Sequence, residues 1–192
     1  ERTVFYDVKC SMALEEAIYS SGGIPKMVRT GHSFMKRELK ENPDSPLAGE
    51  MSGHFFLNDR WPGFDDSLYN TARLLEIIAR EPSPEEGGPK FSDWFDDLPK
   101  YASTGEAKVP LTMNRIETMD SVERKFSDMK YSNVDGVRVS YPEGWFLCRP
   151  SNTEPILVMR AEANDEEGLV NIKQDVEERL GEIINLEKFH NA

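Results

Sequence analysis

The chain has 192 residues, of which 38% are hydrophobic and 30% charged, a composition typical of folded globular domains and not of disordered proteins. Its net charge of -12 argues against binding to nucleic acid or to an anionic membrane, because both would require a basic surface. No apolar run reaches membrane-spanning length, and the two cysteines form neither a C-x-x-C pair nor a disulfide framework, which favours a cytoplasmic protein with reduced thiols.

Strand-like and helix-like segments alternate in the first part of the chain. The run Thr3–Val8 is rich in β-branched and aromatic residues and predicts a buried strand, and Pro25–Arg29 predicts a second. Helices are expected over Ser11–Tyr19 and Phe34–Lys40. A third strand should lead into the glycine-flanked loop Gly49–His54. This alternation predicts an α/β layered domain with a mainly parallel sheet, whose ligand would lie at the carboxyl ends of the strands.

The segments after this loop are less regular. Phe55–Asn58 predicts an antiparallel strand, and Asp65 or Asp66 caps a clear helix. The apolar residues of that helix recur at helical spacing and are expected to bury one face: Leu68, Ala72, Leu75 and Ile78. Glu81–Lys90 reads as a flexible surface insertion, and Phe91–Leu98 as a short amphipathic helix anchored by Trp94 and Phe95.

The pattern changes after a predicted interdomain connector at Tyr101–Thr112. A helix is expected over Ser121–Met129, and a last helix follows Asn164. Three strand candidates lie between them: Gly136–Tyr141, Trp145–Arg149 and Ile156–Ala163. The sequence therefore predicts two domains, residues 1–107 and 108–192, the second an α+β unit with a three- or four-stranded antiparallel sheet covered on one side by helices.

The loop Gly49–His54 carries a carboxylate, a hydroxyl and an imidazole on Glu50, Ser52 and His54. Such groups suit the binding of hydroxyl groups, although a tight turn with polar residues fits the loop about equally well. Lys9 and His32 follow the first and second predicted strands and are expected at the same sheet edge.

A second polar segment follows the strand that ends at Arg149. Ser151, Asn152 and Thr153 lie between two prolines, and Arg160 lies within the next strand. A guanidinium with several neutral donors suits a phosphate group. An ordinary hairpin turn with a surface arginine remains the other interpretation.

Three motifs together carry a resemblance to a known family. They are Arg29-Thr30-Gly31-His32-Ser33, Gly49-Glu50-Met51-Ser52-Gly53-His54 and Arg149-Pro150-Ser151-Asn152-Thr153-Glu154-Pro155. In this order and at this spacing the chain resembles the α-D-phosphohexomutase superfamily, from about Thr3 to about Leu180. The methionine at position 51 makes the loop more similar to the bacterial phosphomannomutase/phosphoglucomutase branch than to the phosphoglucosamine mutases, which usually have glutamine at this position.

The resemblance implies a fold and a missing part. Members have four domains around a deep cleft, and this chain resembles only the third, which is α/β, and the fourth, which is like the TATA-binding protein. The phosphoserine loop of the first domain and the aspartate-rich Mg²⁺ loop of the second have no counterpart here. We therefore expect a fragment of a longer polypeptide that lacks the N-terminal domains 1 and 2 and is inactive alone.

The resemblance also implies roles for individual residues. Glu50 and Ser52 would hold the O3 and O4 hydroxyls of the sugar. Catalytic basic residues facing the reacting phosphosugar would be Lys9, His32 and His54. The phosphate that is not transferred would be bound by the third motif and the arginine behind it: Arg149, Ser151, Asn152, Thr153 and Arg160.

The implied function is that of an isomerase, an intramolecular phosphotransferase that interconverts hexose 1-phosphate and 6-phosphate. Its intermediate would be glucose or mannose 1,6-bisphosphate, and its Mg²⁺ would be held by residues outside this chain. The alternatives are a phosphoglucosamine mutase fragment and a non-catalytic phosphosugar-binding module. The expected partners are a hexose phosphate and the absent domains, with no nucleic acid and no membrane.

Overall fold

The computed structural model describes residues 2–192. The chain divides into two compact units, unit 1 ending at Pro99 and unit 2 beginning at Lys100. This division falls before the boundary between residues 107 and 108 that the sequence predicts.

Unit 1 contains a mixed sheet whose strand order, within the described residues, is β2-β1-β3-β4. The strands are β1 (Thr3–Asp7), β2 (Ile24–Val28), β3 (Leu47–Gly49) and β4 (Phe55–Leu57). Strand β1 pairs in parallel with β2 and β3, and β4 returns antiparallel to β3. The predicted α/β domain with a mainly parallel sheet is confirmed.

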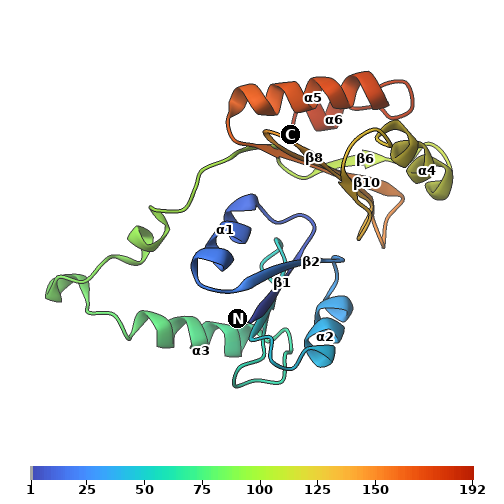
Figure 1. The fold of residues 1–192 in the computed structure, drawn as a ribbon. Coiled ribbons are helices and arrows are strands. Elements are labelled where there is room, and N and C mark those ends of the chain that lie inside the picture. The colour runs from blue at the N-terminus through green and yellow to red at the C-terminus, as the bar shows by residue number, and fades with distance from the viewer. Residues whose placement is uncertain (1) are drawn as a thin grey trace. The chain divides into compact units, whose positions relative to one another are not determined.

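Helices α1 (Met12–Ser20) and α2 (His32–Glu41) cover opposite faces of this sheet (Figure 1). Neighbouring residues of β1 point to opposite faces, so Phe5 packs in one core cluster with Met35 of α2, whereas Tyr6 packs in another with Ile18 of α1. Ser11 caps α1, because its side chain accepts a hydrogen bond from the Ala13 amide.

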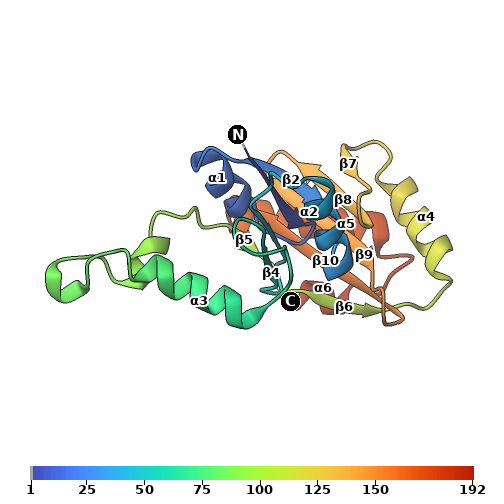
Figure 2. The same cartoon turned by 90° about the horizontal axis from the view of Figure 1, so that it is seen from below.

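Helix α3 (Ser67–Ile78) begins where the sequence predicts, with Asp66 accepting hydrogen bonds from the amides of Leu68 and Tyr69. The prediction that its apolar face is buried was wrong for the described residues. Leu68 is 83% exposed, and Leu75 is exposed as well. Figure 2 shows α3 in green, extending away from the strands of unit 1. The apolar spacing predicted the helix correctly but did not show whether another part of the protein covers its apolar face.

Two short 3₁₀ helices, Pro84–Glu86 and Phe91–Phe95, follow α3. The second replaces the amphipathic helix predicted over Phe91–Leu98. Phe95 is exposed, so it does not anchor this segment, whereas Trp94 is half-buried. Aromatic edge contacts of Phe91 with Trp94 and Phe95 hold the turn instead.

Unit 2 is built on a sheet of order β5-β10-β9-β8-β7, in which β6 also pairs with β10. The strands are β5 (Ala102–Ser103), β6 (Ala107–Pro110), β7 (Tyr131–Ser132), β8 (Val137–Tyr141), β9 (Gly144–Pro150) and β10 (Ile156–Ala163). All pairs are antiparallel, as predicted. The described part of the sheet has six strands, more than the three or four expected.

The extra strands correct the predicted connector at Tyr101–Thr112. Strands β5 and β6 lie within that segment and hydrogen-bond to β10, so it belongs to unit 2. Ala107 and Val109 are buried in the core of this unit. Small and polar residues around Gly105 resembled a linker, but alternate positions of β6 point into the core.

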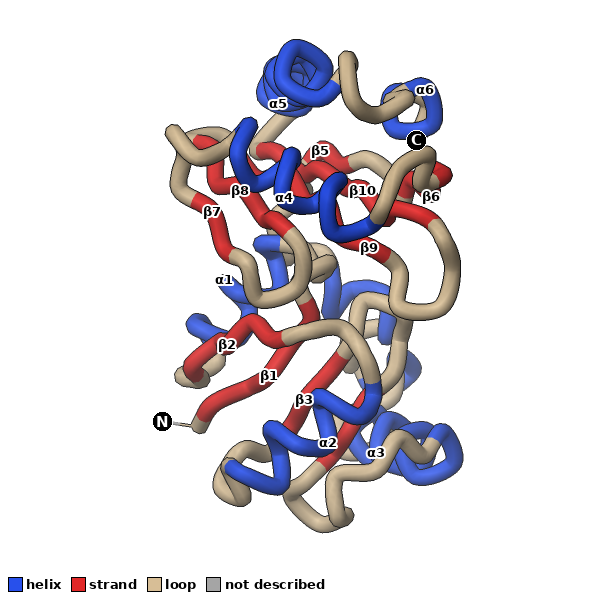
Figure 3. The backbone as a smooth tube through the Cα atoms, turned by 90° about the vertical axis from the view of Figure 1, so that its right-hand side faces the viewer, coloured by secondary structure: helices blue, strands red, loops and turns tan. Residues whose placement is uncertain are grey.

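Helices α4 (Arg115–Lys125), α5 (Glu166–Leu180) and α6 (Glu187–His190) cover one face of this sheet (Figure 3). Helix α4 begins and ends earlier than the predicted span Ser121–Met129, because Asn114 caps it and Phe126 ends it. Phe146 of β9 lies between Phe126 and Phe189 in the core. Among the described residues, no helix combines the length and apolar character needed to cross a membrane.

Candidate sugar- and phosphate-binding sites

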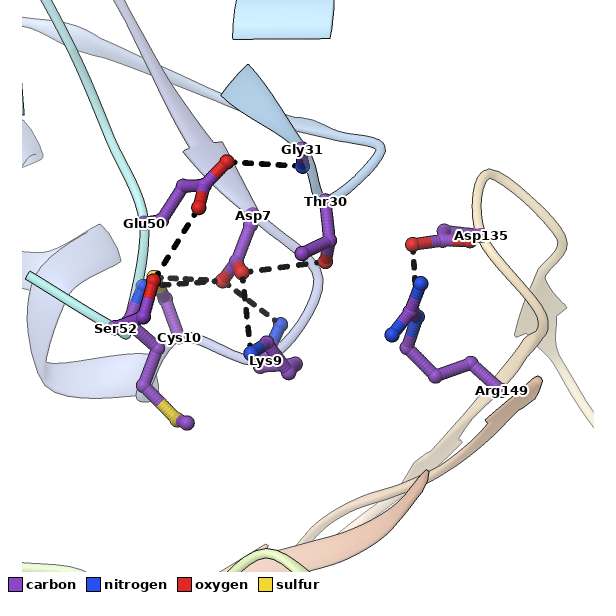
Figure 4. A network of polar contacts seen from close by, with 10 residues as sticks. Asp7, Lys9, Cys10, Thr30, Gly31, Glu50, Ser52, Asp135 and Arg149 are labelled. Atoms are coloured by element: carbon purple, nitrogen blue, oxygen red, sulfur yellow. Dashed lines mark hydrogen bonds and ion pairs between the residues drawn. The ribbon is translucent and has the colours of Figure 1, made fainter. Parts of the chain in front are cut away.

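Three loops of unit 1 leave the carboxyl ends of its parallel strands and carry the predicted polar residues. Lys9 follows β1, the segment Thr30–His32 follows β2, and Glu50 follows β3. Because β1 lies between β2 and β3, these loops are neighbours at one sheet edge, as Figure 4 shows for Lys9, Thr30 and Glu50.

Glu50 is held by the loop that follows β2. Its Oε1 atom accepts a hydrogen bond from the Gly31 amide at 2.9 Å, and its Oε2 atom accepts one from the Ser52 hydroxyl at 3.3 Å. The loop itself is tight, since the Glu50 amide donates to the His54 carbonyl and the Gly53 amide donates to the Glu50 carbonyl, each at 2.9 Å. Gly53 has φ +85°, a conformation that glycine adopts without strain. The structure thus brings the two predicted sugar-binding residues together.

Asp7, the last residue of β1, lies beneath these loops and is fully buried. Its carboxylate accepts hydrogen bonds from the Lys9 amide and the Thr30 hydroxyl, each at 3.2 Å. The Met51 amide lies 3.4 Å from the same carboxylate. Lys9 is also buried, and its Nζ atom lies 3.8 Å from Asp7 Oδ2. One acidic side chain therefore contacts all three loops.

The two predicted catalytic histidines differ in their surroundings. His32 is the first residue of α2, inside the helix rather than in the loop before it, and is exposed. His54 is exposed at the end of the glycine loop, and its Nδ1 atom lies 2.6 Å from Asp65 Oδ2. A carboxylate oxygen only accepts hydrogen bonds, so this contact places a proton on Nδ1 of the imidazole.

In unit 2, Arg149 forms a buried ion pair near the end of β9. Its Nε atom donates to Asp135 Oδ2 at 2.9 Å, and Arg149 is 5% exposed (Figure 4). Its Nη2 atom is buried without a hydrogen-bond partner among the described residues. A buried donor without a partner costs free energy, which is recovered when an anionic ligand accepts from it.

The turn after Arg149 is organised by Ser151. The buried Ser151 side chain accepts hydrogen bonds from the amides of Thr153 and Glu154, at 3.3 and 3.2 Å, and the Ser151 amide donates to the Ile156 carbonyl. Asn152 and Thr153 are exposed at the tip. The hydroxyl hydrogen of Ser151 is not used in these two contacts, so Ser151 retains the capacity to donate.

Arg160 is placed on the same face of the unit 2 sheet as Arg149. Val158 lies opposite Arg149 in the register, and Arg160 is two residues further along β10. The Arg160 guanidinium lies 5.8 Å from the ring centre of Trp145 and 3.8 Å from Glu162. The structure therefore brings the two predicted phosphate-binding arginines to neighbouring strands.

Sequence reasoning missed three aspartates. Asp7, Asp65 and Asp135 each contact a predicted site residue, namely Lys9, His54 and Arg149. The signal for Asp7 was a charge within an otherwise apolar strand sequence, which at the end of a parallel strand indicates a binding edge. Asp65 and Asp135 lie in loops, and their sequence neighbours gave no comparable signal.

A metal site is a separate question. Among the described residues, no group of three or more histidine, cysteine, aspartate or glutamate side chains is arranged to hold a metal ion.

Two family models match the chain. Residues 1–101 match "Phosphoglucomutase/phosphomannomutase, alpha/beta/alpha domain III", and residues 106–179 match "Phosphoglucomutase/phosphomannomutase, C-terminal domain". The first match covers unit 1, and the second covers most of unit 2. They agree with the α/β fold of unit 1 and the α+β fold of unit 2.

Individual proteins resemble the chain over most of its length. The phosphomannomutase/phosphoglucomutase of Pseudomonas syringae pv. tomato is 43% identical over 173 residues, which cover 88% of this chain and 36% of the relative. A crystal structure of a phosphoglucomutase/phosphomannomutase family protein from Burkholderia thailandensis is 41% identical, with a TM-score of 0.79, and the match covers 93% of this chain and 37% of that chain. The chain thus spans about a third of the length of these proteins.

A more distant structure shares the fold alone. The N-acetylphosphoglucosamine mutase of Aspergillus fumigatus, in complex with GlcNAc-6P and magnesium, is 12% identical with a TM-score of 0.65. The match covers 93% of this chain and 38% of that chain.

Proposed function

The chain belongs to the phosphoglucomutase/phosphomannomutase family, and we propose that it is the sugar- and phosphate-binding part of an enzyme that interconverts hexose 1-phosphate and hexose 6-phosphate. The observation that carries this proposal is that two polar loops, one in each family domain, present complementary groups: a carboxylate for hydroxyls and a buried guanidinium for phosphate. The reaction passes through a hexose 1,6-bisphosphate, so the same groups bind the sugar in two orientations.

On the sugar side, Glu50 and Ser52 bind the O3 and O4 hydroxyls. A carboxylate has about four acceptor sites, and Gly31 and Ser52 occupy two of them, so Glu50 retains the capacity to accept from a sugar. Glucose and mannose have the same configuration at these oxygens. A site that reads O3 and O4 therefore accepts both sugars without distinguishing C2.

On the phosphate side, Arg149, Ser151, Asn152 and Thr153 bind the phosphate that is not transferred, with Arg160 adding positive charge. The support is the buried Nη2 atom of Arg149, which needs an acceptor. Asp135 fixes the guanidinium through Nε and thereby orients the remaining N–H groups. Either phosphate of the bisphosphate enters this pocket, since charge and hydrogen bonds do not read the attached carbon.

For the transfer step, Lys9, His32 and His54 face the reacting end of the phosphosugar. Lys9 stabilises the charge of the moving phosphoryl group. His54, with a proton on Nδ1, has Nε2 available to accept a proton from the attacking hydroxyl or return one. The phosphoserine and the Mg²⁺ belong to domains 1 and 2, which are the protein partners of this chain, and the reaction takes place in the cytoplasm.

The experiment is an amide-resolved NMR titration of the 192-residue chain. Glucose 6-phosphate should shift the signals of residues 50–54 and 149–153, inorganic phosphate should shift only residues 149–153, and neither should produce mutase turnover. Replacement of Arg149 by lysine keeps the charge but loses the forked geometry, and should weaken phosphate binding about tenfold. Arg179→Lys is the matched control, since Arg179 pairs with Asp128 and Asp175 on the helical side of the sheet.

Two outcomes would contradict the proposal. One is an inorganic phosphate titration that leaves residues 149–153 unchanged. The other is mutase turnover by the purified chain, which would mean that no further domain is needed. Glucosamine 6-phosphate in the same titration tests the phosphoglucosamine mutase alternative, which predicts preferential binding of the amino sugar. Binding without turnover after domains 1 and 2 are added would favour a non-catalytic phosphosugar-binding module.

A further inference from the structure

Asp7 is a buried charge whose cost requires an explanation. It is 0% exposed, and an isolated buried carboxylate is strongly unfavourable unless donors and a cation surround it. Lys9 supplies a positive charge, but its Nζ atom is 3.8 Å from Asp7 Oδ2, a distance at the outer limit of a salt bridge. A neutral or apolar residue at the end of β1 would avoid this desolvation cost.

The contacts of Asp7 join segments that are distant in sequence. Its Oδ1 atom accepts from the Lys9 amide and the Cys10 thiol, both at 3.2 Å, and from the Met51 amide. Its Oδ2 atom accepts from the Thr30 hydroxyl and faces the Lys9 ammonium. Met51 follows Glu50 directly, and Thr30 precedes Gly31, the residue that donates to Glu50. The carboxylate therefore contacts both the loop that contains Glu50 and the loop whose Gly31 amide binds Glu50 (Figure 4).

Only a carboxylate meets the demands of this position. Every group around Asp7 is a donor, and two of them are backbone amides that donate only. Asparagine would present an NH₂ group to some of these donors. An NH₂ group in the place of Oδ1 would face two backbone amides, which are donors like itself. The NH₂ group is therefore expected in the place of Oδ2, where it faces the Lys9 ammonium. A replacement by asparagine therefore removes the counter-charge of Lys9 while keeping the backbone contacts.

We propose that Asp7 is a positioning residue for the sugar site, which aligns Lys9 and the Glu50–Ser52 loop through its contacts with all three strand ends. This inference rests on the proposed function for the role of Lys9, Glu50 and Ser52. The geometric part, that Asp7 holds the loops together, stands on the contacts alone. Asp7 itself does not touch the sugar.

The test uses three variants of the 192-residue chain. Asp7→Ala removes all contacts of the carboxylate. Asp7→Asn removes the pairing with Lys9 and keeps the backbone contacts of Oδ1, while the Thr30 hydroxyl, which now donates to Oδ2, would accept from the new NH₂ group. Ser45→Ala is the matched control, because buried Ser45 donates to the Thr3 carbonyl at the opposite end of β1. The first readout is hydrogen exchange of the Met51 and Gly31 amides, and the second is the Kd for glucose 6-phosphate and for inorganic phosphate.

Asp7→Ala should accelerate exchange at Met51 and Gly31, whereas Ser45→Ala should leave these two amides as protected as in the wild type. Asp7→Asn should keep their protection but weaken glucose 6-phosphate binding about tenfold, the loss expected when one charged contact is misplaced. Inorganic phosphate binding should be unchanged in all variants. If Asp7→Ala does not fold, Asp7→Asn alone decides through the ratio of the two Kd values.

The outcomes separate the two ideas. If the wild type does not bind glucose 6-phosphate, the proposed function fails, while exchange at Met51 and Gly31 still tests the role of Asp7. If the wild type binds and Asp7→Asn binds equally well, the positioning role is overturned. Unchanged exchange at Met51 in Asp7→Ala, or equal acceleration in Ser45→Ala, overturns it as well.

Discussion

The imidazole of His54 and the carboxylate of Asp65 are joined by a contact of 2.6 Å between Nδ1 and Oδ2. Asp65 is held in place because it forms an isolated backbone bridge with Phe56 of β4. A second histidine, His190, contacts Glu177 at the same distance but through Nε2. The two rings are therefore fixed through opposite nitrogens.

This difference predicts opposite neutral tautomers. In the neutral form of each ring, His54 should carry its proton on Nδ1 and His190 on Nε2, because each of these nitrogens faces a carboxylate. A proton–nitrogen correlation spectrum of the ring signals distinguishes the two forms. Asp65→Asn should release the tautomer of His54 only, and Glu177→Gln should release that of His190 only. Identical tautomers in the wild type would contradict the geometry.

A second prediction compares two leucines of unit 1 that receive the same substitution. Leu39 lies on the buried face of α2 and is 2% exposed, so Leu39→Ala should lower the free energy of unfolding by about 2–5 kcal/mol. Leu68 is 83% exposed, so Leu68→Ala should change it by less than about 0.5 kcal/mol. Urea unfolding of both variants measures the difference. Equal losses would mean that the face of α3 is covered.

A third prediction concerns Gly136, which lies beside the buried ion pair of Arg149. Its φ is +78°, and a Cβ atom there would lie 2.4 Å from the Cys148 carbonyl oxygen and 2.6 Å from Arg149 Cα. Gly136→Ala should therefore unfold at a lower temperature and displace Asp135 from Arg149. Gly22→Ala is the control, since Gly22 has φ +76° but no atom within 4 Å of the added Cβ.

In the control Gly22→Ala, the free energy of unfolding should fall only by the cost of the left-handed conformation, about 1–2 kcal/mol. In Gly136→Ala the free energy of unfolding should fall by more, because the atoms nearest the added Cβ belong to backbone that cannot move aside. Thermal unfolding followed by circular dichroism gives both values. Equal losses would show that the space beside Arg149 is larger than the structure indicates.

A fourth prediction follows from Cys148, whose complete burial raises the pKa of its thiol from 9.0 to about 12. The thiolate is the reactive form, so a disulfide reagent at about pH 8 should modify Cys148 only as fast as the protein unfolds. In a Cys10→Ser variant, any modification comes from Cys148 alone, and unfolding in urea should make Cys148 reactive. Because the folded pKa is raised, the contribution of this thiol to stability is present below pH 9.0 and declines as the pH rises toward about 12. Rapid modification without denaturant would contradict the burial.

Sequence reasoning predicted the elements of unit 1 well, because strand and helix periods are local properties. It failed for the burial of α3, since the spacing of Leu68 and Leu75 defines a face but does not name the surface that covers it. It also misread β5 and β6 as a connector. Their pairing partner β10 lies far along the chain, and short strands carry little periodicity.

For the candidate site, the motifs led to the prediction of Glu50, Ser52, Arg149 and Ser151 as site residues, and this stays a prediction. The structure places Glu50 beside Ser52 and Arg149 before the Ser151 turn. The acidic residues that orient these groups were not predicted. Asp7 and Asp135 act through contacts with residues from other strands or loops. Such pairings depend on the register of the sheet, which sequence spacing does not reveal.

The central strand of unit 2 affects how the chain folds during synthesis. Strand β10 joins β5 and β6 on one side to β9 on the other, and it emerges from the ribosome after all of them. The sheet of unit 1 closes with residues that precede Pro99, so it is able to fold while unit 2 is still being translated. Until Ile156–Ala163 appears, β5 and β6 have no partner, and their open edges are exposed to chaperones or to neighbouring nascent chains.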